Sequence, residues 1–223
     1  MSAATRCEGC GRPFNASFDA CPFCLRSVKA IAAPPPPELL TVARAALASR
    51  DATAAIRAYA ALLVTEPTHT TALIELAVLL AGQGEQAGAL EMAGRAIASA
   101  PDDPLMYDHR AVIQARAGDF EHALADVDRG LALAPSHPSM LRRKSNYLGR
   151  LGRYPESMAA IQKALSLEPL NTEARLTEVE LIIRLGDSAA AKTAFDKAMR
   201  EVELTARDRT VTDRISAKLA ASS

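Results

Sequence analysis

Residues 131–169 read LALAPSHPSMLRRKSNYLGRLGRYPESMAAIQKALSLEP, so the segment begins with LALAP and ends with the closely similar LSLEP. Related phrases place four prolines 34 residues apart, at Pro67, Pro101, Pro135 and Pro169. A proline here stops the preceding helix and fixes the turn that follows it. The spacing predicts that one structural element is repeated along most of the chain.

Other residue types recur in phase with these prolines. Glycine recurs once per period, and small side chains recur at two further positions. The glycines are Gly84, Gly118, Gly152 and Gly186; one small set is Ala43, Ala77, Ala111 and Ser145, and the other is Ala55, Ala89, Ala123, Ser157 and Ala191.

This 34-residue pattern resembles the tetratricopeptide repeat, which is a helix-turn-helix unit. The resemblance covers roughly residues 36–203. It implies an all-α, right-handed solenoid of about five repeats in which the small residues mark close helix contacts. The repeats would start near residues 36, 70, 104, 138 and 172.

The resemblance weakens toward the C-terminus. The tryptophan of the family's first helix is replaced by Leu39, Leu73, Tyr107 and Leu141, and by Arg175 in the fifth repeat, which also has Glu203 in place of its last proline. Residues 206–223 then carry Val211, Ile215 and Leu219 four residues apart. This spacing predicts an amphipathic helix that caps the end of the solenoid.

All four cysteines lie in residues 1–26, as the pairs Cys7-Glu-Gly-Cys10 and Cys21-Pro-Phe-Cys24. Zinc takes four tetrahedral ligands, and two residues between paired cysteines let one turn present both thiolates. We therefore predict a structural Zn²⁺ site with Cys7, Cys10, Cys21 and Cys24 as ligands. Iron binding and thiol redox chemistry are alternatives, although no βαβ pattern surrounds either pair.

The cysteine segment resembles the short zinc-ribbon families, which implies a small hairpin. It departs from them at Leu25, where a second glycine often follows the last cysteine. Residues 27–37 end in four consecutive prolines, which favour an extended polyproline II spacer. We predict a ribbon, this linker, a repeat array over residues 38–205, and the terminal helix and tail.

The charge of the chain argues against a nucleic-acid or membrane partner. Lysine plus arginine and aspartate plus glutamate both number 26, so the formal net charge is zero. No apolar segment precedes Cys7, and the most apolar later stretch, residues 72–81, contains Glu75 and is too short to span a bilayer. We expect a soluble cytoplasmic protein.

The resemblance also implies a concave groove lined by the first helix of each repeat. Carried over to this chain, the groove would be apolar at one end and basic at the other, and would hold an acidic or mixed peptide. The predicted lining is Ile74, Val78, His109, Arg116, Arg142, Arg143, Asn146 and Arg150.

Arg142 and Asn146 occupy positions at which chaperone-binding members of the family hold a peptide's C-terminal carboxylate. Arginine can bind a carboxylate through two parallel hydrogen bonds. Thr177 stands where the next asparagine of that motif is expected. An ordinary solvated basic face is therefore the alternative to a carboxylate-binding site.

No catalytic motif accompanies these features, and we predict a non-catalytic protein. His69, His122 and His137 are expected at turns or helix starts, and Asp126 and Asp128 on a solvated helix face. The predicted function is an adaptor that binds a protein or peptide partner, with the ribbon as a second docking site or a packing cap. The alternative is a regulator of transcription, translation or envelope assembly, in which the ribbon contacts nucleic acid or another complex.

Overall fold

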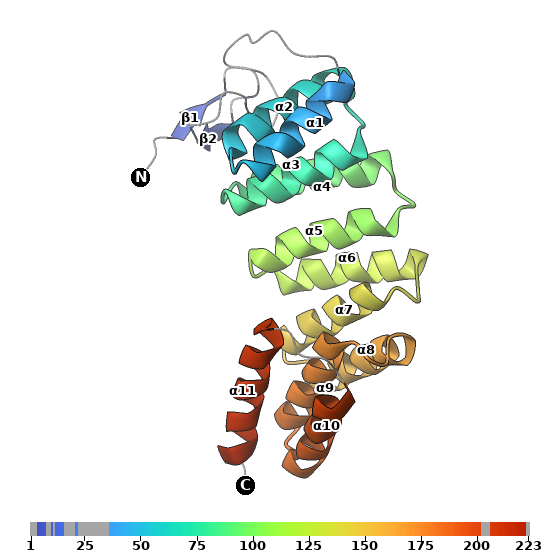
Figure 1. The fold of residues 1–223 in the computed structure, drawn as a ribbon. Coiled ribbons are helices and arrows are strands. Elements are labelled where there is room, and N and C mark those ends of the chain that lie inside the picture. Colours follow the sequence, from blue (N-terminus) through green and yellow to red (C-terminus); the bar gives the residue numbers. More distant parts are fainter. Residues whose placement is uncertain are drawn as a thin grey trace. The chain divides into compact units, whose positions relative to one another are not determined.

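A computed structural model describes residues 4–7, 10, 12–15, 21, 36–201 and 206–221 (Figure 1). These residues form two short strands and eleven helices. The chain divides into two compact units, Met1–Ala117 (unit 1) and Gly118–Ser223 (unit 2).

Unit 1 begins with a short strand pair. Strand β1 (Ala4–Arg6) runs antiparallel to β2 (Pro13–Asn15), with Thr5 opposite Phe14. The Cys7 amide donates to the Arg12 carbonyl at 2.9 Å, which extends the pairing past the end of β1. Cys7 and Cys10 therefore lie in the connection between the strands. Cys24 and residues 27–35 of the predicted linker lie outside the described residues, as does Glu203.

Five helices complete unit 1. The first helices of successive repeats begin one period apart, at Pro36, Thr70 and Pro104. A single cluster of buried side chains runs through α1 to α4 and also includes Met106 and Ile113 of α5. The helices are α1 (Pro36–Ala48), α2 (Ala52–Thr65), α3 (Thr70–Gly82), α4 (Gln86–Ser99) and α5 (Pro104–Arg116).

Unit 2 contains the other six helices. Helices α7 and α9 again begin one period apart, and each packs against the helix that follows it. The helices are α6 (Phe120–Leu133), α7 (Pro138–Arg150), α8 (Tyr154–Leu167), α9 (Thr172–Arg184), α10 (Ser188–Glu201) and α11 (Ala206–Ala221). The predicted all-helical repeat solenoid is thus confirmed.

The recurring glycines form the turns between helices. Gly152, between α7 and α8, has a φ of 75°, in the left-handed region that disfavours other residues. The following amide, that of Arg153, donates to the Leu148 carbonyl at 2.9 Å and closes the end of α7. Gly84, Gly118 and Gly186 also have positive φ values, of 82°, 84° and 89°.

The two sets of small residues lie where helices meet, as predicted. Every member of both sets is fully buried. The two serines satisfy their own polar groups, because the Ser157 hydroxyl donates to the Ser145 carbonyl at 2.6 Å and the two hydroxyls lie 2.9 Å apart. A serine can therefore replace alanine at this contact without leaving a buried hydroxyl unsatisfied.

The prediction for Asp126 is wrong, since its relative exposure is only 2%. Asp126 lies on the face of α6 that also buries Ala123 and Val127, and one carboxylate oxygen is 3.9 Å from Arg129. Asp128, two residues on, is exposed and forms an ion pair with Lys144 at 2.7 Å. The solvated face of α6 therefore carries Asp128 but not Asp126.

Helix α11 lies beside α9 (Figure 1). Ile215 and Leu219 are buried with Leu176 and Val179 of α9, and Ala191 of α10 completes this cluster. On the neighbouring face of α11, Arg214 donates to Glu180 of α9 at 2.6 Å. The terminal helix is thus held by an apolar contact and an ion pair.

Candidate peptide-binding groove and metal centre

Three cysteines of unit 1 converge in the structure. The sulfurs of Cys7, Cys10 and Cys21 all lie within 4.8 Å of one another, and those of Cys10 and Cys21 are 3.6 Å apart. That distance is too long for a disulfide bond of about 2.05 Å. Two thiolates bound to one tetrahedral zinc, with Zn–S bonds of about 2.3 Å, are separated by about 3.8 Å. The three residues therefore fit three corners of a zinc site.

The cysteine segment also contacts the helices of unit 1. Cys7 and Cys21 are buried in the same cluster as α1 to α4. Arg12, beside β2, forms an ion pair with Glu91 of α4. The segment therefore shares its buried surface with the first repeats.

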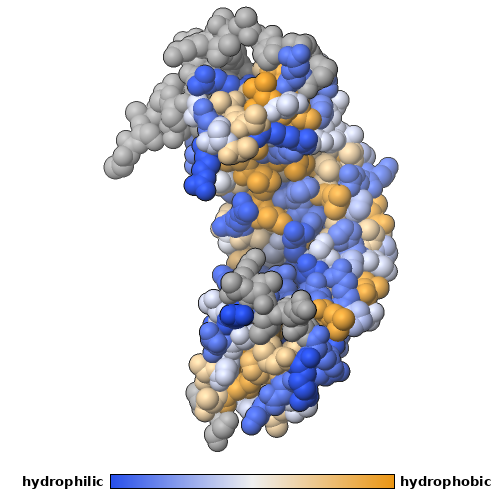
Figure 2. All heavy atoms as spheres, viewed as in Figure 1, coloured by the Kyte–Doolittle hydropathy of each residue, from blue (hydrophilic) through white to orange (hydrophobic). Residues whose placement is uncertain are grey.

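Residues predicted to line the groove in unit 1 differ in exposure. Ile74 has a relative exposure of 6%, whereas Val78, one turn further along α3, has 38%. His109 is half-buried and Arg116 is exposed, both on α5. Figure 2 shows hydrophobic residues gathered over the helices of unit 1. Val78 is therefore the more exposed of these two apolar side chains, and Ile74 belongs mainly to the core.

A polar network that joins α1, α2 and α3 was not predicted from the sequence. The Arg44 guanidinium donates to both oxygens of Glu75, the shortest contact being 2.8 Å, and the buried Tyr59 hydroxyl donates to Glu75 at 2.7 Å. Burial, reinforced by the bond to Glu75, raises the pKa of Tyr59 above its usual range. The carboxylate of Glu75, which interrupts an apolar stretch of sequence, is therefore paired with Arg44 within the fold.

In unit 2, α7 and α9 form a small hollow of about 230 Å³ that contains three of the predicted groove residues. We call it the Arg142 hollow. Both walls supply polar side chains, which differ in the hydrogen bonds that they can donate and accept. Its lining is Ser139, Arg142, Arg143, Asn146, Tyr147, Glu173 and Thr177.

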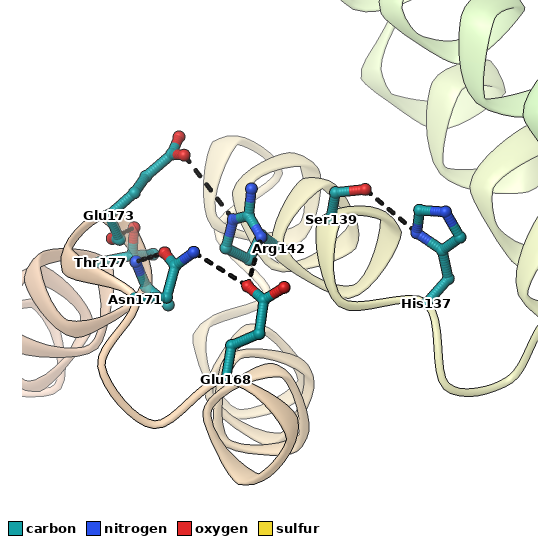
Figure 3. Close-up of polar contacts among 8 residues, drawn as sticks. His137, Ser139, Arg142, Glu168, Asn171, Glu173 and Thr177 are labelled. Carbon is teal, nitrogen blue, oxygen red and sulfur yellow. Dashed lines mark hydrogen bonds and ion pairs between the residues drawn. The ribbon is translucent and has the colours of Figure 1, made fainter.

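Arg142 is held by carboxylates of the protein itself. Its guanidinium lies 3.2 Å from Glu168, which precedes Pro169, and 3.6 Å from Glu173 at the start of α9 (Figure 3). Asn171 donates to the same Glu168 at 2.9 Å. A ligand carboxylate at Arg142 would have to compete with these two groups, which was not apparent from the sequence.

A larger pocket of about 520 Å³ adjoins α7 and α9 on the side of α11, and we call it the α11 pocket. Asn146 and Arg150 of the predicted groove line it. The Arg150 guanidinium carbon lies 5.0 Å from the centroid of the Phe120 ring, a cation–π contact that orients the side chain.

Sequence reasoning missed the other basic residues of this pocket. Arg184 stands in phase with Arg116 and Arg150, so the repeat period was a signal for it. Arg214 and Lys218 come from α11, which has no counterpart in the other repeats, and no such signal existed for them.

Helix pairs that recur every 34 residues define the chain as a helical-repeat protein. The chain belongs to the tetratricopeptide repeat family, because the family profile matches residues 40–104 and 109–172, more than half of the sequence. Proteins of this family typically mediate protein–protein interactions, and the fold is generally a non-catalytic scaffold. Among the described residues, no helix is both long and apolar enough to cross a membrane.

Solved structures share this fold. MamA of Desulfovibrio magneticus is 16% identical with a TM-score of 0.67, over 74% of this chain and 93% of that one. A thermophilic TPR protein of Thermus thermophilus is 20% identical with a TM-score of 0.62, over 83% and 100%. PilF of Pseudomonas aeruginosa is 15% identical with a TM-score of 0.67, over 84% and 88%. Comparison with curated proteins gives no match.

Proposed function

We propose that the protein is a non-catalytic adaptor that binds a peptide segment of a partner protein along the first helices of its repeats. The Arg142 hollow is the observation that carries this proposal, since it brings charged and neutral polar side chains of α7 and α9 to one recess. Such convergent polar groups orient a peptide, and the neighbouring helix surface contributes contact area.

We also propose a structural zinc ion bound by Cys7, Cys10, Cys21 and Cys24. The clustering of the first three sulfurs and their separation support it. The ion would fix the N-terminal segment against α4, where Arg12 pairs with Glu91. This pairing occupies one of the basic side chains that a nucleic-acid-binding ribbon would need, so the adaptor is the favoured function.

Capture of partners by the full-length chain tests the adaptor. Reversing charge in the Arg142 hollow with Arg142→Glu and Arg143→Glu together should lower recovery of a specific partner at least about tenfold, because the change places two negative charges in the hollow and removes the Arg142 contacts with Glu168 and Glu173. The matched control is Lys163→Glu with Lys197→Glu, which makes the same charge change at exposed sites outside both pockets. Partner identity and recovery would be measured by mass spectrometry.

The metal ligand variant Cys10→Ser separates the groove from the ribbon. If the groove is the binding site, this variant should recover the same partner as the wild type. Equal recovery by the Arg142→Glu/Arg143→Glu variant and the wild type, with loss in Cys10→Ser, would instead assign binding to the ribbon.

A further inference from the structure

The α11 pocket combines residues of the repeats with residues of the terminal helix. Its volume of about 520 Å³ lies within the range of roughly 300–1,000 Å³ that is usual for ligand sites. Helices α7 and α9 form two walls and α11 forms the third. The pocket is therefore incomplete without α11.

Two neighbouring faces of α11 have different roles. Ile215 and Leu219 are buried against α9 and α10, which fixes how the helix is rotated. Arg214 and Lys218 are four residues apart and so lie on one face, which lines the pocket. The apolar anchor thus directs two basic side chains to a defined place.

Positive charge is concentrated in this pocket. Arg150, Arg184, Arg214 and Lys218 line it, whereas Glu180 is the one acidic lining residue in the part of the chain that the structure describes. Glu180 already accepts a hydrogen bond of 2.6 Å from Arg214. Gathering like charges costs electrostatic free energy, and a bound anion removes that cost.

The uncharged lining completes a set of hydrogen-bond donors. The exposed Asn146 amide is a donor in the wall of the pocket, whereas the Thr177 hydroxyl already donates to the Glu173 carbonyl at 2.8 Å. The floor at Ser145 and Ser157 is already satisfied by the bonds between these residues. A ligand would therefore be bound by the walls, where guanidinium groups can hold carboxylates through paired hydrogen bonds.

The two pockets of unit 2 differ in how much anion-binding capacity the fold itself uses. Arg142 has two carboxylates beside it, Glu168 and Glu173. Within the described residues, Arg184 forms neither an ion pair nor a hydrogen bond through its side chain. An anion should therefore prefer the α11 pocket to the Arg142 hollow.

We propose that the α11 pocket binds an acidic segment of the partner protein, rich in aspartate or glutamate. Helix α11 then forms part of the binding site in addition to capping the end of the repeats. This inference rests on the proposed adaptor function and specifies the partner's chemistry. A nucleic-acid strand is less suited to the pocket, because single strands are held by series of stacked aromatic rings, and Tyr154 is the sole aromatic lining residue among those described.

Binding of a defined probe to the full-length protein tests the proposal. The probe is fluorescein-labelled octa-glutamate with an amidated C-terminus, followed by fluorescence anisotropy. Lys218→Gln and Arg184→Gln should each weaken binding about fivefold, as expected for one partly exposed charge contact. Arg209→Gln, an exposed α11 position outside the pocket, is the matched control and should bind as the wild type does.

The outcomes separate this proposal from the adaptor function. Unchanged binding in both pocket variants, or no binding of octa-glutamate by the wild type, would overturn the acidic-segment assignment. If the Arg142→Glu/Arg143→Glu variant nevertheless failed to capture the partner, the adaptor function would remain supported. Tighter binding of labelled octa-thymidylate than of octa-glutamate, weakened by the same two variants, would reassign the pocket to nucleic acid. Circular dichroism of each variant checks that the helices are retained.

Discussion

Asp119 caps the first turn of α6 and also contacts the ring of His122. One oxygen accepts from the His122 amide at 3.3 Å, and the other lies 2.8 Å from the His122 ring nitrogen Nδ1. The side-chain bond to His122 is the main cause that lowers the pKa of Asp119 below its usual value of 3.8. The charged carboxylate is therefore the form that stabilises this helix end.

We expect Asp119→Ala to lower the free energy of unfolding by about 1 kcal/mol at pH 7, the usual effect of removing an N-cap. Because the folded pKa of Asp119 is below the unfolded one, its electrostatic contribution is present above about pH 4 and is lost as the pH falls through the folded pKa. Urea unfolding at pH 7 and pH 3 should show a smaller difference between Asp119→Ala and the wild type at pH 3.

Asp119→Asn is the control, because an amide oxygen still caps the helix while the charge is gone. It should destabilise the protein less than Asp119→Ala at pH 7. A loss that is the same at both pH values for Asp119→Ala would show that the carboxylate charge does not contribute.

Single residues also show where sequence analysis reaches its limit. Histidine was correctly expected at helix starts, and His69 accepts from the Ala72 amide at 3.2 Å. Asp126 was misplaced, because a carboxylate on a helical face reads as solvated unless the faces of its neighbours are known. The contact of Arg142 with Glu168 joins residues 26 positions apart through two flexible side chains, and no periodic pattern records it.

The helices that follow the 34-residue period could be predicted from the sequence. Helix α11 could be predicted only in part. The 34-residue spacing predicted that the small residues lie at helix contacts, and each of them is fully buried. The apolar spacing of Val211, Ile215 and Leu219 predicted that residues after 205 form an amphipathic helix. Its contact with α9 through Arg214 and Glu180 was not predictable, because a single terminal helix has no repeat to set its partner.

Replacing Ile215 by aspartate tests how α11 is held. The Ile215 side chain is fully buried, and an unpaired charge there costs more than the exposed ion pair of Arg214 with Glu180 can restore. We expect α11 to detach, so that hydrogen exchange of its amides in Ile215→Asp approaches the rate of an unfolded peptide. Hydrogen-exchange mass spectrometry of the full-length variant would measure this.

Ser216→Asp adds the same charge one residue later at an exposed position and should leave α11 protected. Full protection of α11 in Ile215→Asp would contradict the anchoring role given to the buried face. Loss of protection throughout unit 2 would instead show that α11 is needed for the fold of α9 and α10.

At the scale of the whole molecule, stability in a repeat protein is transmitted mainly between neighbouring elements. Cys7 and Cys21 share a buried cluster with α1 to α4 in unit 1, whereas Ile215 and Leu219 belong to a separate cluster in unit 2. A perturbation at the cysteine cluster should therefore be felt by the first repeats and fade along the chain. The proposed zinc ion provides such a perturbation.

We expect the purified full-length protein to contain about one zinc per chain, as measured by elemental mass spectrometry, and Cys10→Ser to contain much less. Removing the metal should raise hydrogen exchange in α1 to α4, because the buried Cys7 and Cys21 lose the bonds that hold them against these helices. Exchange in α7 to α11 should not change. Ser2→Ala, near the cluster in sequence but not a metal ligand, is the control. Equal loss of protection in both units would contradict nearest-neighbour transmission, and a zinc-free wild type would contradict the metal site itself.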